Sequence, residues 1–262
     1  MPRRLHLAIA LVLVFAPILG AAPARLRPAE ADDLASIVQT LEPAAVAGKV
    51  PDILAARLAC LRLLSGSPAA DRVPLIRYTV AYAAWRVAFS PEVSARDQMA
   101  LLDDATVQLE AAIKADGRFA EAMGLLGAID GAKIAHAPDL GMTLGPESSA
   151  ILGQAVGLEP NNPRLLVFRG QGQFHTPPEF GGSIKDAEAT FRRALQAFDQ
   201  EPATKAWPNW GRFDAHAWLG QALASRNDKA GARAEYEKAL AIAPDSAWVK
   251  YSLLPQVKGP EW

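Results

Sequence analysis

The sequence predicts an almost entirely α-helical protein, built as an α-solenoid of helix-turn-helix repeats with irregular insertions. Three observations predict this fold. Alanine is abundant and runs of β-branched residues are rare, a composition that favours helix over strand. Apolar residues recur at helical spacing along most of the chain. Small residues, an aromatic residue and a closing proline also recur in one shared register, so neighbouring units must stack to bury their apolar faces.

The stretch 213–246 is the clearest of these units. Its spacing predicts two short antiparallel helices joined at Asn227 and Asp228, with small residues where the helices touch. Its marker residues, in order, are Leu219, Gly220, Ala232, Tyr236, Ala239 and Pro244. This pattern resembles the tetratricopeptide repeat, a helix-turn-helix unit of about 34 residues. The resemblance implies a right-handed superhelix in which the first helix of each unit lines a concave face that binds peptides or helices.

The same register places three further units upstream, at 72–119, 120–162 and 163–200. Gly117 and Pro160 occupy the place that Pro244 has in the fourth unit. The expected helices are 30–41, 53–64, 73–89, 95–115, 118–135, 147–158, 163–173 and 184–198, then the pair in 213–246 and a capping helix at 246–254. Pro43 is expected to end the first helix. Irregular stretches are expected at 136–146, 174–183 and 199–211.

The N-terminus has the order of a secretory signal peptide. Arg3 and Arg4 precede a nearly continuous apolar run, and small residues follow it. The expected division is a signal peptide at 1–24, a helical hairpin at 25–71, the repeat array with its capping helix at 72–254, and a flexible tail at 255–262. The alternative is an uncleaved membrane anchor, but the run is short beside the about 20 residues that a bilayer span needs. The sequence therefore predicts a secreted, periplasmic protein without a stable membrane span.

Composition and motifs argue against several function classes. The formal net charge of −1 argues against nucleic acid as a partner. Cys60 is the single cysteine, so no internal disulfide can form, and its apolar surroundings predict a small core residue. His136, His175 and His216 have no partner at helical metal-ligand spacing, and no catalytic or phosphate-binding motif occurs. We expect no enzyme activity, no cofactor and no metal.

The inserted stretches are candidates for function, because loops longer than a fold requires are often functional. Two interpretations remain open. Phe180, Trp207 and Trp210 either plug gaps between irregular repeats or rim a binding groove, with His175 and Glu179 as polar contacts. The Phe-Gly-Gly and Trp-Gly sequences in these stretches are similar to those of exported bacterial repeat proteins that look like the T component associated with TRAP transporters.

The resemblance to the repeat family also predicts a concave binding surface. Its apolar and Gln-rich character lacks the Lys, Arg and Asn clamp with which some family members hold a terminal carboxylate. Together with the insertions, the candidate residues are Arg164, Val167, Gln171, Phe174, His175, Glu179, Phe180, Trp210, Asp214 and Gln221. The leading hypothesis is an exported scaffold for protein–protein interaction. The alternative is a ligand-binding periplasmic component serving a transporter, with a pocket enclosed by Phe174, His175, Phe180 and Trp210.

Overall fold

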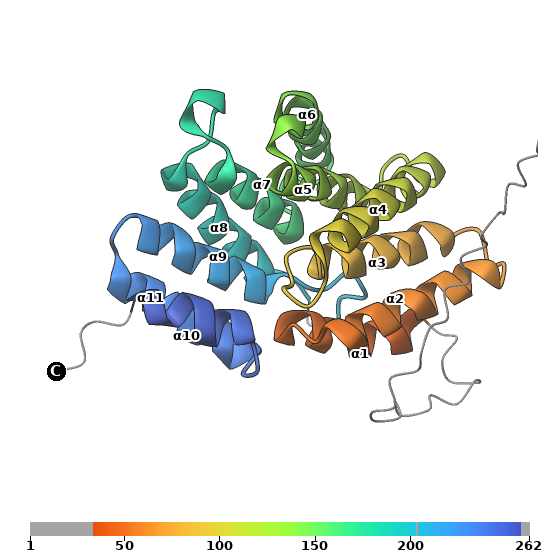
Figure 1. Cartoon of the computed structure of the whole chain (residues 1–262), viewed down its shortest axis with the longest axis horizontal. Helices are drawn as coiled ribbons and strands as arrows, with labels where there is room; N and C mark the ends of the chain where they lie inside the picture. The colour runs from red at the N-terminus through yellow and green to blue at the C-terminus, as the bar shows by residue number, and fades with distance from the viewer. Residues whose placement is uncertain (1–33, 203, 258–262) are drawn as a thin grey trace, which may run out of the picture.

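The structure, a computed structural model, describes residues 34–202 and 204–257. Within these residues the chain forms eleven α-helices and no β-strand (Figure 1). The first ten α-helices are α1 (Leu34–Ala47), α2 (Val50–Ser65), α3 (Val73–Arg86), α4 (Ala95–Ala115), α5 (Ala120–His136), α6 (Gly141–Leu158), α7 (Pro163–His175), α8 (Ile184–Asp199), α9 (Arg212–Ser225) and α10 (Lys229–Ile242). The predicted signal peptide lies outside the described residues.

Consecutive helices pair into antiparallel hairpins, and the hairpins stack in chain order into an α-solenoid. Four hairpins, from α3–α4 to α9–α10, correspond to the four predicted repeat units, and α1–α2 precedes them. The stack curves strongly in Figure 1, so that the first hairpin comes round towards the last. Val46 at the end of α1 packs against the apolar cluster of the C-terminal half. The fold class predicted from the sequence is confirmed as an all-helical solenoid.

Several helices begin at residues whose side chains cap them. α4 begins and ends at the predicted residues, and the Ser94 side chain accepts a hydrogen bond from the Asp97 amide at its start. Asn162 caps α7 ahead of Pro163, whose missing N–H costs nothing at a first helical position. Ser183 caps α8 in the same way through the Asp186 amide.

Two prolines that were predicted to lie at helix boundaries lie inside helices instead. Pro43 does not end the first helix, because α1 continues to Ala47 and buries Ala44 and Ala45 against the core. Pro146 lies inside α6, so the expected irregular stretch 136–146 shrinks to a single 3₁₀ turn. An interior proline costs a helix about 3 kcal/mol. In α1, the burial of Ala44 and Ala45 helps to offset this cost.

The C-terminal helix is also longer than predicted. A π-helical segment, η3 (Trp248–Leu253), leads directly into α11 (Leu254–Val257). Pro255 is the second residue of α11, where its missing N–H breaks no α-helical hydrogen bond of that helix. The capping helix therefore runs beyond the predicted end at 254 and into the stretch expected to be a flexible tail. Residues 258–262 lie outside the description.

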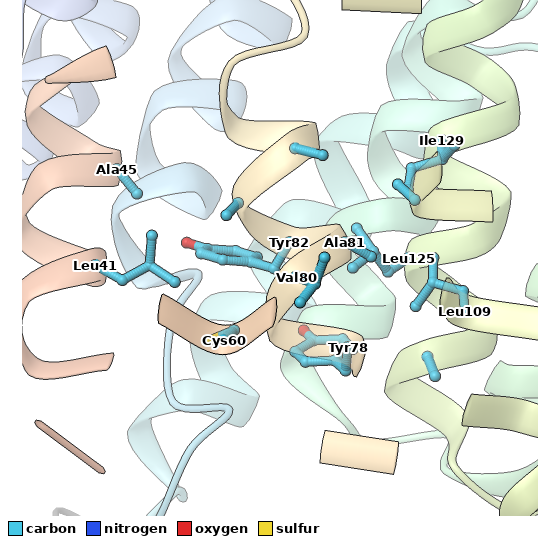
Figure 2. Close-up of a cluster of buried hydrophobic side chains, with 14 of the residues drawn as sticks. Leu41, Ala45, Cys60, Tyr78, Val80, Ala81, Tyr82, Leu109, Leu125 and Ile129 are labelled. Atoms are coloured by element: carbon cyan, nitrogen blue, oxygen red, sulfur yellow. The ribbon is translucent and has the colours of Figure 1, made fainter. Parts of the chain in front are cut away.

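Apolar side chains form two main clusters, one in each half of the molecule. Figure 2 shows part of the N-terminal cluster, where Leu41 of α1, Cys60 of α2 and Tyr82 of α3 lie close together. Cys60 is fully buried, as its apolar surroundings predicted. The C-terminal cluster is built mainly from α8, α9, α10 and η3. No helix among the described residues combines the length and the apolarity needed to cross a membrane.

The small residues at the predicted helix contacts allow close packing. A methyl group added at Gly220 would lie 2.3 Å from a ring carbon of Tyr236 on the paired helix. One added at Gly170 would lie 2.4 Å from the Phe191 ring. Contacts this short do not occur between real side chains. Both glycines are therefore required by the approach of the helices, and the predicted register is correct at Gly220.

Candidate functional site

The segment between α8 and α9 crosses the interior of the superhelix and reaches α3. The Trp207 indole N–H donates to the Thr79 hydroxyl at 2.9 Å, and the Trp210 indole N–H donates to the Tyr78 hydroxyl at 2.7 Å. These bonds join residues 128 and 132 positions apart in the chain. Buried tryptophan normally finds such a partner. The two tryptophans of this segment are therefore part of the packed interior of the protein.

Trp210 stands at the centre of a set of aromatic rings. Its ring centroid lies 5.1 Å from Tyr82, 5.5 Å from Trp85 and 5.3 Å from Phe168. The side chain is 1% exposed. Of the two interpretations that the sequence left open, the one in which the side chain fills a gap between repeats is thus correct for Trp210 and for Trp207. It is wrong for Phe180, which is 69% exposed at the end of a 3₁₀ turn.

A buried cation fixes the same segment to α7. Arg164 is fully buried, and its guanidinium forms an ion pair with both carboxylate oxygens of Glu201. One Nη also donates to the Trp210 carbonyl at 3.1 Å. The Arg164 Nε lies 3.6 Å from the carboxylate of Glu121 on α5. Arg164 therefore orders the interior of the fold.

A second buried cation joins three helices that are distant in sequence. Arg86, at the end of α3, donates to Asp214 of α9 at 2.7 Å and to the Ala45 carbonyl of α1 at 3.1 Å. Asp214 is 3% exposed. Nearby, the Tyr82 hydroxyl donates to the Glu42 carboxylate at 2.5 Å. These contacts close the superhelix by tying its first hairpin to its fourth repeat.

These contacts correct the predicted binding surface. Arg164, Val167, Trp210 and Asp214 are buried and cannot contact a partner. The sequence argument assumed an open concave face, as in regular repeats, whereas the α8–α9 segment fills that face in the N-terminal half. Trp210 consequently does not join Phe174, His175 and Phe180 in a pocket. Among the remaining candidates, Gln171 and Gln221 are half-buried, and Glu179 and Phe180 are exposed on the turn after α7.

Phe174 and His175 do belong to a surface cluster, which we call the aromatic strip. It consists of Phe174, His175, Trp218 and Trp248. Trp218 contacts the other three at centroid distances of 5.0–5.6 Å. Partial desolvation of the imidazole beside these rings lowers the pKa of His175. The strip is accordingly aromatic and contains no Lys, Arg, Asp or Glu side chain.

Sequence reasoning missed Trp218 and Trp248 as parts of this surface. Trp218 lies three residues before Gln221, which was predicted to lie on the concave surface. Trp248 was assigned to the capping helix. The cluster becomes visible only when α9 and η3 are packed together, because the two tryptophans lie thirty positions apart. The only sequence evidence for this surface was Trp218 itself, which lies on the helix face next to the predicted concave face.

A polar cleft lies beside the buried Arg164. It has a volume of about 420 Å³. Its lining comprises Glu121, Glu159, Pro160, Asn161, Asn162, Pro163, Arg164, Glu201 and Lys205. A neighbouring cleft of about 180 Å³ shares Glu201 and Lys205 with it. In the part of the chain that the structure describes, no group of three or more His, Cys, Asp or Glu side chains is arranged to hold a metal ion.

Comparisons with known proteins agree with this geometry. The tetratricopeptide repeat family model matches residues 213–246. A thermophilic TPR protein from Thermus thermophilus superposes with a TM-score of 0.58 at 17% identity, over 84% of this chain and 98% of that one. The HusA haemophore from Porphyromonas gingivalis superposes with a TM-score of 0.55 at 21% identity, over 74% of this chain and 92% of that one. No curated protein matches the sequence.

Proposed function

We propose that this chain, a helical repeat protein of the tetratricopeptide type, is an exported scaffold that binds another protein in the cell envelope. Repeat solenoids present extended surfaces to partners, and their function lies in shape and surface chemistry. Export is supported by the N-terminal sequence, where two arginines, an apolar run and small residues follow in the order of a signal peptide.

The observation that carries the interaction role is the aromatic strip. In the N-terminal half, the α8–α9 segment fills the face that the first helices would otherwise offer to a partner. The aromatic strip lies on α7, α9 and η3, outside the region that the α8–α9 segment covers. Its rings remain partly accessible to solvent. Aromatic residues are enriched at the centres of protein interfaces, because they bury a large area with few rotatable bonds. The strip is therefore the surface that we assign to a partner.

Replacing Trp218 tests this assignment. The Trp218→Ala variant is expected to lose most partner recovery when tagged protein is incubated with envelope extract, because hot-spot tryptophans cost about 2 kcal/mol or more on truncation. The Tyr251→Ala variant is the matched control, since Tyr251 is 77% exposed and lies outside the strip. Melting curves of both variants check that the fold is retained. Equal recovery by wild type and Trp218→Ala would contradict the assignment.

The ligand-binding alternative has its own test. One structural neighbour is described as a haemophore, so haemin is a suitable small-molecule probe. Haemin is expected to leave the melting temperature and its own absorption spectrum unchanged on mixing. A saturable haemin shift that is lost in His175→Ala, together with no specific protein recovered from extract, would overturn the scaffold proposal in favour of ligand binding.

A further inference from the structure

Two indole N–H groups of the aromatic strip, those of Trp218 and Trp248, have no hydrogen-bond acceptor in the part of the chain that the structure describes. Neither indole nitrogen is buried, so both donors face solvent. By contrast, the indoles of Trp207 and Trp210 donate to hydroxyl groups of α3. An indole N–H can only donate. The strip therefore offers two unused donors to a ligand.

Gln221 adds a third unused donor beside the strip. It lies three residues after Trp218 on α9, so the two side chains are neighbours on the helix surface. The amide nitrogen of Gln221 is buried and has no acceptor among the described residues, whereas buried polar groups almost always have a partner. Rotation of this side chain towards solvent would let it donate to a ligand bound at Trp218. The unused polar groups of this face thus favour a ligand that brings acceptors.

The rings of the strip also meet at large angles. The plane of Trp218 is inclined by 66° to Phe174, 81° to His175 and 56° to Trp248. Rings inclined in this way form notches instead of one flat plate, so they suit small apolar groups better than a broad planar ligand. The strip has no Lys, Arg, Asp or Glu side chain with which to select a charged ligand.

We propose that the aromatic strip binds a proline-rich segment in the polyproline II conformation, whose carbonyl groups accept from Trp218 and Trp248. Proline supplies a carbonyl and no N–H, so such a segment meets the unused donors without bringing donors of its own. The segment is ordered before it binds, which lowers the entropy cost of docking in an aromatic groove. Steps of 5.6 Å join Phe174 to Trp218 and Trp218 to Trp248, together about one polyproline II turn of roughly 9 Å. A helical partner fits less well, because its backbone carbonyls are bonded within the helix.

This inference rests on the proposed interaction role of the strip, and a synthetic peptide tests it without any extract. The probe is hexaproline with blocked ends, and the control is a Gly-Ser peptide of equal length, which is flexible and carries N–H groups. In calorimetric titration of the full chain, hexaproline is expected to bind with a Kd of about 1 mM or tighter, and the control peptide should not bind at the same concentrations.

Two substitutions of Trp218 separate its donor from its ring. Trp218→Phe keeps an aromatic ring and removes the N–H, so it should weaken hexaproline binding by about two- to tenfold. Trp218→Ala removes both and should weaken binding by more than about tenfold. Equal binding by wild type and both variants would overturn the inference.

The NMR signals of the indole N–H groups provide a readout that disturbance of the fold would not imitate. Hexaproline should shift the signals of Trp218 and Trp248 in the wild-type protein. The signals of Trp207 and Trp210 should stay in place, because these indoles are already bonded inside the protein. Single tryptophan-to-phenylalanine variants assign the signals. Shifts confined to Trp207 and Trp210 would contradict the proposed site.

The possible outcomes distinguish this inference from the scaffold proposal. If hexaproline does not bind, while Trp218→Ala still loses partner recovery from extract, the inference is wrong and the scaffold role stands. Binding of an amphipathic helical peptide in place of hexaproline, or self-association that Trp218→Ala abolishes, would likewise overturn the inference. If hexaproline does not bind and Trp218→Ala recovers partners as wild type does, both proposals are wrong.

Discussion

Glu42 is a residue whose ionisation is strongly affected by its burial in the closed molecule. Burial beside α3, together with the nearby Asp214 carboxylate, raises the pKa of Glu42 to about 7. Arg86, the Tyr82 hydroxyl and Arg164 act in the opposite direction without cancelling the effect of burial. The folded protein therefore holds a proton on Glu42 at pH values where the unfolded chain has already released it.

This proton makes stability fall as pH rises between 4.5 and about 7. In that range the unfolded state binds fewer protons than the native state, so the free energy of unfolding decreases with pH. Glu42→Gln keeps an acceptor for Tyr82 and removes the ionisation. We expect the variant to be more stable than wild type at pH 8 by on the order of 1–3 kcal/mol, with little difference at pH 4.

Urea denaturation at a series of pH values measures this difference. Other groups titrate in the same range, including Asp130, whose pKa is raised to about 6 by burial. The quantity to follow is therefore the difference in the free energy of unfolding between the variant and wild type. Glu237→Gln, at an exposed ion pair, serves as the control and should run parallel to wild type. A gap between Glu42→Gln and wild type that stays constant with pH would contradict the prediction.

At the scale of the helix, glycine has two different roles in this chain. Gly220 lies where α9 and α10 touch, and no side chain fits there. Gly153 lies in the interior of α6, where an added methyl group would meet nothing within 4 Å. Glycine in a helix interior costs about 0.5–1 kcal/mol relative to alanine. The first glycine is required by packing, whereas the second lowers the stability of its helix without a packing reason.

Alanine at these two positions should therefore change stability in opposite directions. Gly153→Ala is expected to stabilise the protein by about 0.5–1 kcal/mol. Gly220→Ala is expected to destabilise it by about 1–3 kcal/mol, because the methyl group collides with the Tyr236 ring. Thermal melts of the two single variants decide the question. Changes of the same sign would show that the assigned contact between α9 and α10 is wrong.

The sequence predicted helices well where local chemistry decides them. Ser94 and the acidic first turn define the start of α4, and the repeat register places the small residues of α9 and α10. It failed at Pro43, because a proline's local cost was weighed without the packing that a longer helix gains, and α6 likewise continues through Pro146. Ala45 shows this gain, since its carbonyl in the last turn of α1 accepts a hydrogen bond from Arg86.

At the scale of the whole molecule, the closure of the superhelix could not be predicted from the sequence. The repeat register describes each unit and its neighbour, but Asp214 and Arg86 lie 128 positions apart. Asp214 falls on the face that regular repeats expose, so the register assigned it to a binding surface. Only the tertiary path of the α8–α9 segment shows that this face is covered.

Asp214 should consequently be far more important for stability than an exposed aspartate. Asp214→Ala leaves Arg86 buried without its carboxylate, and breaking a buried pair in this way costs about 3–5 kcal/mol. Asp199→Ala removes a partly exposed pair with Arg212 and should cost about 0–1 kcal/mol. Chemical denaturation of both variants provides the comparison. Similar midpoints for the two would show that the closure contributes little.

The bridge from Trp207 and Trp210 to α3 also bears on how the chain folds. Solenoids usually fold through contacts between adjacent repeats, so that structure can begin at any repeat and spread. Here, the ring set around Tyr78 and Tyr82 is completed only by residues more than 120 positions later. Such contacts raise the contact order and slow folding. During synthesis the N-terminal half must keep an unfinished apolar surface until the segment before α9 arrives, so the two halves become stable together.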